Sequence, residues 1–277
     1  MPACVGPVKK GEIDTIMEKK MKILILGAGK MGSFFTDLLS FNHNVAVLET
    51  NPERMRFIYN ALRFTDYKQV EEFAPDMVIN CVTLNYTIQA FRDVIPYLPQ
   101  TCILADIASV KTGLKEFYQE CGFRFVSTHP MFGPTFANLG NLQTENAIII
   151  KESDYLGKVF FKDLFNTLKL NICEYTFEGH DEVVAYSLSI PFASTLVFAS
   201  IMKHQDAPGT TFKKHMAIAR GLLSEDDYLL TEILFNPNTP AQLEKIIDEL
   251  TRLRTIVEKK DSAEMKCFLD GVRRNLE

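Results

Sequence analysis

The order of apolar segments along the chain predicts an α/β domain followed by a helical one. Short continuous apolar runs, typical of strands buried on both faces, alternate with segments whose apolar residues recur at helical spacing. Strands that alternate with helices imply a mostly parallel, doubly wound sheet of the Rossmann type. The predicted strands are 22–26, 44–48, 77–82, 102–106, 123–126, 146–150 and 170–175.

The strand pattern stops after residue 177, and only helical patterns follow. We predict a disordered N-terminal extension over residues 1–20, a Rossmann-type domain over 21–176 and an all-α domain over 177–277. The extension lacks the apolar segment of a secretory signal, so the fold is expected to begin at Met21.

The segment 182–203 is predicted to be a helix that is apolar on nearly all faces. It contains 20 residues without a charge, between Val183 and Met202, which is long enough to span a membrane. Its hydroxyl groups and Pro191 make it too polar for lipid, so we predict no membrane contact. A helix that is apolar all round is typically buried in protein, and this predicts a homodimer joined through the helical domain.

Composition narrows the classes of function. The net charge is −5 and the 30 basic residues are spread along the chain, so no basic face is predicted and nucleic-acid binding is excluded. The six cysteines lie far apart without a CxxC pair, which predicts reduced thiols, no metal site and a cytoplasmic location.

A glycine-rich turn follows the first strand. Gly27, Gly29 and Gly32 have the GxGxxG spacing between a strand and a helix. In such a turn the first glycine permits a tight bend, the second lets the backbone approach a pyrophosphate, and the third lets helix and strand pack closely. The pyrophosphate then lies on the helix N-terminus, so Lys30 and Met31 are predicted cofactor contacts.

The second strand ends in Glu49, where an acidic residue bonds the adenosine ribose diol. A carboxylate there repels a 2′-phosphate, so NAD is predicted as the cofactor in preference to NADP. Arg54 is the competing signal, because a nearby arginine can accept that phosphate. Thr83 and Leu84, after the third predicted strand, complete the predicted cofactor contacts.

Two further polar residues follow predicted strands, and both are candidates for catalysis. Ser109 comes after strand 102–106, and His129 is expected in a turn beyond strand 123–126. Ligands bind beyond the carboxyl ends of parallel strands, so these residues should converge with Glu49 and Thr83. The structural alternatives are a histidine satisfied by hydrogen bonds under a tight turn and a serine that caps the next helix.

Three motifs in this order resemble the prephenate and arogenate dehydrogenases of tyrosine biosynthesis. They are Asp106-Ile107-Ala108-Ser109-Val110-Lys111, His129-Pro130-Met131-Phe132-Gly133-Pro134 and Gly179-His180-Asp181. The resemblance runs from about Met21 to near the C-terminus. It implies hydride transfer from the ring alcohol of a cyclohexadienol to NAD while the ring carboxylate leaves as carbon dioxide.

The same resemblance implies roles for individual residues. His129 would take the hydroxyl proton with a pKa of about 6 to 7, and Ser109 would bond the same hydroxyl or His129. His180, Lys213 and Arg220 are the remaining substrate-binding candidates. Lys111 is expected to be solvated, and Asp181 is expected to cap a helix.

The chain departs from the family pattern in the helical domain. Two histidines of a Ser-His-Leu-Pro-His stretch are replaced within Leu188-Ser189-Ile190-Pro191-Phe192, and Arg220 is one position from the register of the family's arginine. The substrate is therefore prephenate or arogenate. Two other classes stay open: a 3-hydroxyacid or imine-reducing dehydrogenase, and a nucleotide-sensing module without catalysis.

Overall fold

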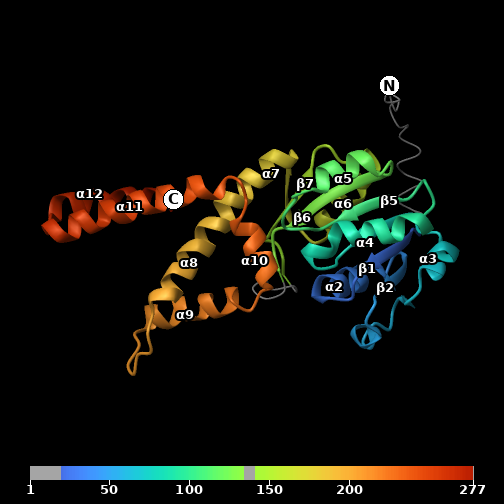
Figure 1. Ribbon diagram of the computed structural model, residues 1–277, viewed down its shortest axis with the longest axis horizontal. Helices are drawn as coiled ribbons and strands as arrows, with labels where there is room; N and C mark the ends of the chain where they lie inside the picture. Colours follow the sequence, from blue (N-terminus) through green and yellow to red (C-terminus); the bar gives the residue numbers. More distant parts are fainter. Residues whose placement is uncertain (1–19, 134–140, 277) are drawn as a thin grey trace. The chain divides into compact units, whose positions relative to one another are not determined.

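The computed structural model describes residues 20–133 and 141–276, and the chain divides into two compact units between His180 and Asp181 (Figure 1). The predicted disordered extension therefore lies, apart from Lys20, outside the described residues, as does Pro134. The prediction that one domain ends at 176 and the next begins at 177 stays a prediction.

The first unit is built on one eight-stranded sheet with the order β3-β2-β1-β4-β5-β6-β7-β8. Adjacent strands are parallel except β6 and β7, which are antiparallel. The predicted mostly parallel, doubly wound sheet followed by a helical region is therefore confirmed. The strands are β1 (Lys22–Leu26), β2 (Asn44–Leu48), β3 (Leu62–Phe64), β4 (Met77–Asn80), β5 (Ile103–Asp106), β6 (Arg124–Pro130), β7 (Asn146–Ile150) and β8 (Asn171–Tyr175).

The helices of this unit follow the strands in alternation, which covers the sheet on both faces. Ile23 and Ile25 belong to a core cluster that includes Phe35 of α2 and Phe161 of α6. The next residue of β1, Leu24, points to the opposite face and is also fully buried. The helices are α2 (Lys30–Leu39), α3 (Tyr67–Phe73), α4 (Thr87–Val94), α5 (Leu114–Glu120) and α6 (Tyr155–Thr167).

The helical part of the chain begins with α7 (Phe177–Val184), which continues through a π-helical segment (Ala185–Ser189) into α8 (Ile190–Ile201). The remaining helices are α9 (Thr210–Leu222), α10 (Asp227–Leu234), α11 (Thr239–Lys259) and α12 (Ser262–Arg274). Buried hydroxyls tie the π-helical segment to α10 and α11: Ser189 Oγ donates to the Ile233 carbonyl at 3.0 Å, and Thr239 Oγ1 donates to Ser189 Oγ at 2.8 Å.

Within the described residues, one continuous helix, Phe177–Ile201, is long and apolar enough to cross a membrane by length and composition. Only 17% of the most apolar 18-residue stretch of this helix is buried within the described residues. Val197 and Ile201 are among its exposed side chains. A helix of this composition needs apolar surroundings, either lipid or a second protein surface.

Several local predictions were wrong. His129 lies inside β6 and not in a turn beyond it. The list of predicted strands lacked β3, which has only three residues and includes Arg63. Asp181 lies within α7 and caps no helix end there.

Candidate active site

The glycine turn has the geometry expected of a pyrophosphate-binding turn. Gly27 has a φ of +88°, a left-handed conformation that favours glycine. A Cβ at position 32 would lie 2.0 Å from the Gly27 carbonyl oxygen, so α2 can approach β1 only with glycine there. At position 29 no described atom lies within 4 Å of the place of a Cβ. This open backbone at the N-cap of α2 fits a phosphate group, and exposed Lys30 and half-buried Met31 form the first turn beside it.

Glu49 lies directly behind this turn. Its Oε2 accepts from the Ala28 N–H at 2.9 Å, and its Oε1 accepts from the Asn51 N–H at 2.9 Å and from Thr50 Oγ1 at 3.2 Å. Burial raises the pKa of Glu49, but these hydrogen bonds and the charge of Arg54 outweigh it and lower the pKa overall. The carboxylate is therefore charged at neutral pH. Arg54 Nη1 lies 4.0 Å from it, on an exposed side chain.

The end of β4 forms the next part of the same sheet edge. Asn80 is buried, donates from Nδ2 to the Thr87 carbonyl and accepts at Oδ1 from the Val82 N–H. These bonds shape the segment that carries Thr83, the exposed N-cap of a short 3-10 helix beginning at Leu84. The predicted cofactor residues therefore follow β1, β2 and β4, three adjacent parallel strands whose carboxyl ends meet at one edge.

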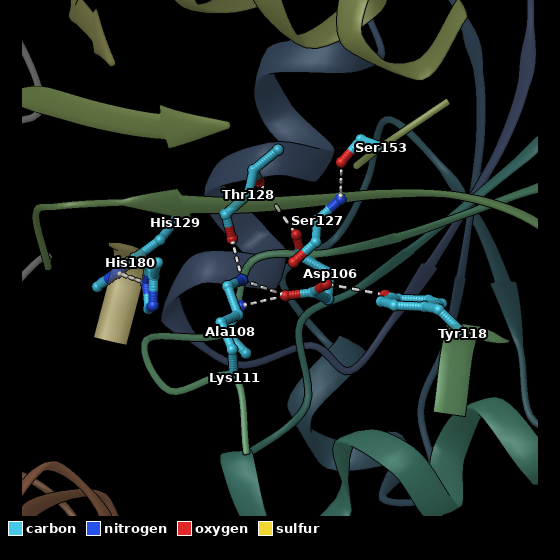
Figure 2. A network of polar contacts seen from close by, with 9 residues as sticks. All are labelled: Asp106, Ala108, Lys111, Tyr118, Ser127, Thr128, His129, Ser153 and His180. Carbon is cyan, nitrogen blue, oxygen red and sulfur yellow. Dashed lines mark hydrogen bonds and ion pairs between the residues drawn. The ribbon is translucent and has the colours of Figure 1, made fainter. Parts of the chain in front are cut away.

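His129 lies two strands further along this edge and is 4% exposed. Its Nδ1 is 2.9 Å from Nε2 of His180, which is fully buried in α7 (Figure 2). Burial lowers the pKa of His129 well below 6.5, and the charges of His180 and Lys111 lower it further. The sequence-based expectation of a pKa between 6 and 7 is therefore corrected downward.

The pair of imidazoles determines which nitrogen of His129 can do chemistry. With Nδ1 engaged by His180, Nε2 is the nitrogen that can take a proton from a substrate. For this, Nδ1 must carry the hydrogen and donate it to His180, whose Nε2 then accepts. The arrangement can therefore hold a neutral general base in one tautomer.

Ser109 is half-buried in a bend after β5. It does not cap α5, because the N-cap of that helix is Gly113. The segment that carries Ser109 is fixed instead by Asp106, whose Oδ1 accepts from the Ala108 N–H at 3.0 Å.

A buried polar network lies beneath Ser109 and His129 and was not predicted from the sequence. Lys111 was expected in solvent, but its side chain is 1% exposed and its Nζ donates to Asp106 Oδ1 at 2.6 Å. Asp106 Oδ2 accepts from the Tyr118 hydroxyl at 2.8 Å (Figure 2). The only sequence signal for this network is a carboxylate at a strand end followed five residues later by a lysine.

The other two substrate candidates lie in the second unit. Lys213 and Arg220 are both exposed on α9. Their roles stay predictions.

Part of the chain matches a known family, and the chain has distant relatives over most of its length. Residues 44–169 match the family described as prephenate dehydrogenase, nucleotide-binding domain. The chain is 24% identical over 258 residues to the probable arogenate/prephenate dehydrogenase of Methanocaldococcus jannaschii, covering 86% of this chain. It spans 57% of the length of that relative.

Two solved structures have the same fold over nearly the whole chain. One is prephenate dehydrogenase from A. aeolicus in complex with hydroxyphenyl propionate and NAD+, with a TM-score of 0.79, 20% identity and coverage of 93% of this chain and 97% of that one. The other is Synechocystis arogenate dehydrogenase, with a TM-score of 0.71, 17% identity and coverage of 93% and 100%. The part of the α/β unit over residues 44–169 thus matches the nucleotide-binding domain of prephenate dehydrogenases, and the chain as a whole has the fold of these solved prephenate and arogenate dehydrogenases.

Proposed function

We propose that this protein is an NAD-dependent dehydrogenase that oxidises prephenate with loss of carbon dioxide. The observation that carries the proposal is the His129–His180 pair, with Nδ1 and Nε2 2.9 Å apart, on the same sheet edge as the glycine turn. The family match supports the reaction class, and arogenate is the second candidate substrate because both names occur among the relatives.

The cofactor is NAD, which accepts a hydride when bound. Gly27, Gly29 and Gly32 would hold its pyrophosphate with the first turn of α2, where Lys30 and Met31 lie. The charged Glu49 would bond the ribose diol and repel a 2′-phosphate. Thr83 and Leu84 would border the same crevice after β4.

His129 is the general base. Its Nε2 takes the proton of the ring hydroxyl as hydride leaves the same carbon, and the electrons of the breaking bond to the ring carboxylate complete the aromatic ring as a phenolate. The phenolate oxygen then takes the proton back from Nε2, which restores the neutral base. His180 accepts the Nδ1 hydrogen of His129 and so keeps the reactive nitrogen unprotonated before each turnover. Ser109 bonds the substrate hydroxyl or His129, and Lys213 and Arg220 supply positive charge for the substrate carboxylates.

The helical unit supplies a dimer interface. The exposed apolar residues of α8, including Val197 and Ile201, support association with a second copy in the cytoplasm.

The test is to mix the purified protein with NAD and either prephenate or arogenate and to follow NADH absorbance. Stoichiometric carbon dioxide and an aromatic product should accompany NADH with one of the two substrates. NAD binding without turnover of either would contradict the proposal. Turnover of a 3-hydroxyacid or an imine would then favour the alternative dehydrogenase class, and binding alone would favour a nucleotide sensor.

A further inference from the structure

The buried pair of Asp106 and Lys111 has no assigned role in the proposed reaction. Both side chains are almost completely enclosed, with exposures of 0% and 1%. Burying two charges costs several kcal/mol per ion, and apolar residues of similar volume often stabilise a protein equally well. Stability is therefore a poor explanation for a charged pair at this place.

The bonds of the pair connect the two segments that carry the candidate catalytic residues. Asp106 Oδ1 accepts from the Ala108 N–H, next to Ser109, and from Lys111 Nζ. Lys111 Nζ also donates to the Thr128 carbonyl at 2.7 Å, next to His129. Each contact is therefore one residue from a group that would meet the substrate (Figure 2).

The sheet explains why the Thr128 carbonyl needs such a partner. The parallel pairing of β5 with β6 ends with Asp106 opposite Ser127, so Thr128 lies beyond that ladder. Its hydroxyl donates to the Asp106 carbonyl at 3.0 Å, and its carbonyl accepts from Lys111. Asp106, Lys111 and Thr128 thus form a closed ring of hydrogen bonds where the ladder between β5 and β6 has ended, while β6 continues to pair with β7 on its other side.

We propose that Asp106 and Lys111 are positioning residues that hold the Ser109 segment and the His129 end of β6 in one catalytic geometry. The inference rests on the proposed function. Neither residue takes part in proton or hydride transfer. A misplacement of about 1 Å at reacting groups can reduce a rate about 100-fold, so a clamp between two catalytic segments has a measurable consequence.

The pair should also affect the charge state of His129. The titratable groups around His129 are His180 from α7, Lys111 from the segment after β5, and Asp106 from β5. The facing strand β7, which pairs with His129 through Ile148, has only uncharged side chains. The charge of Lys111 lowers the pKa of His129, so its removal should raise that pKa.

The experiment compares Lys111→Met with the double variant Asp106→Asn/Lys111→Met in the full-length protein. Lys162→Met is the matched control, because it breaks a surface ion pair between Lys162 and Glu174 of 2.6 Å. The kcat of each variant is calculated per mole of folded enzyme, and the concentration of folded enzyme is measured by titration of the NAD-binding sites. We expect Lys111→Met to lower kcat by about 10- to 100-fold, with KM for NAD within about twofold. The acid limb of the pH profile should move to higher pH.

The double variant separates positioning from stability. Lys111→Met leaves the Asp106 carboxylate buried without its lysine, whereas the double variant removes both charges, so its Tm should recover toward the wild type. The kcat should remain low. Recovery of kcat together with Tm, or a kcat of Lys111→Met within about twofold of wild type, would overturn the proposal.

A substrate-independent measurement distinguishes this result from failure of the proposed function. The chain has only five histidines, so NMR titration of labelled imidazoles can be assigned with single variants. The His129 titration should move to higher pH in Lys111→Met and not in Lys162→Met. If the wild type oxidises neither substrate, the proposed function fails, and an unmoved His129 titration would independently overturn the role of the pair.

Discussion

Replacement of His129 by asparagine removes the proposed base with little change in packing. The asparagine amide can still donate a hydrogen bond to His180 but cannot accept a substrate proton at neutral pH. His129 is 4% exposed, so solvent has little access to replace it as the base. A general base typically contributes 10² to 10⁴ in rate, which corresponds to about 2.7 to 5.5 kcal/mol of activation free energy. We expect kcat to fall by that factor, with a much smaller change in KM.

The assay is the pH dependence of NADH formation. The base must be unprotonated, and burial lowers the pKa of His129 well below 6.5. Wild-type activity should therefore be flat from pH 8 to about 6.5 and fall only at lower pH. This acid limb should be absent from His129→Asn. His43→Asn is the control, because His43 is half-buried and burial also lowers its pKa. His43 directly precedes β2, so it lies at the amino end of a strand, whereas the candidate site lies at the carboxyl ends.

The role of His129 as the general base is refuted if His129→Asn retains more than about a third of the wild-type kcat, since a lost base should lower the rate at least about 10²-fold. An acid limb that persists in the variant would also assign the titration to another group. Loss of activity in His43→Asn of the same size would indicate a general effect of histidine replacement on the fold.

Three further predictions follow from features of the two units. Glu49→Ala should reduce the preference for NAD over NADP, measured as the ratio of kcat/KM values, and equal use of both cofactors by the wild type would contradict the role of Glu49. His129 has a folded-state pKa below the unfolded value of 6.5, so the stability associated with its neutral form is present above pH 6.5 and is lost as the pH falls; His129→Asn should lose less stability by denaturant titration between pH 7 and 5. The wild type should sediment as a dimer at micromolar concentration, and Val197→Lys/Ile201→Lys should shift it toward monomer; a wild-type monomer would refute the interface.

The cofactor half of the site could be predicted from sequence because its signals are local. The turn from Gly27 to Gly32 depends on the backbone freedom of three residues within one strand–helix junction, and the structure confirms the tight bend and the close packing. Glu49 could be predicted in the same way, because it is the residue directly after β2. Its hydrogen bond to the Ala28 N–H needed the structure, because it joins segments 21 residues apart.

The catalytic half could be predicted only in part. Pro130 argued against a strand, since proline cannot donate to a sheet ladder, but it is the last residue of β6 and pairs with the antiparallel β7. Lys111 was misassigned because its partner Asp106 and the Thr128 carbonyl come together only when β5 and β6 are adjacent. Burial of a lysine depends on such tertiary pairing and not on its own sequence neighbours.

The contact between positions 27 and 32 also limits how this chain can evolve. The atom that excludes a side chain at Gly32 is the carbonyl oxygen of Gly27, 2.0 Å from the place of a Cβ. Any other residue at position 27 would have to adopt a φ of +88°, which strains L side chains. A descendant sequence that admits alanine at position 32 must first move that carbonyl, which would change the turn that faces the pyrophosphate. We therefore expect a chain that keeps this nucleotide site to keep glycine at both positions.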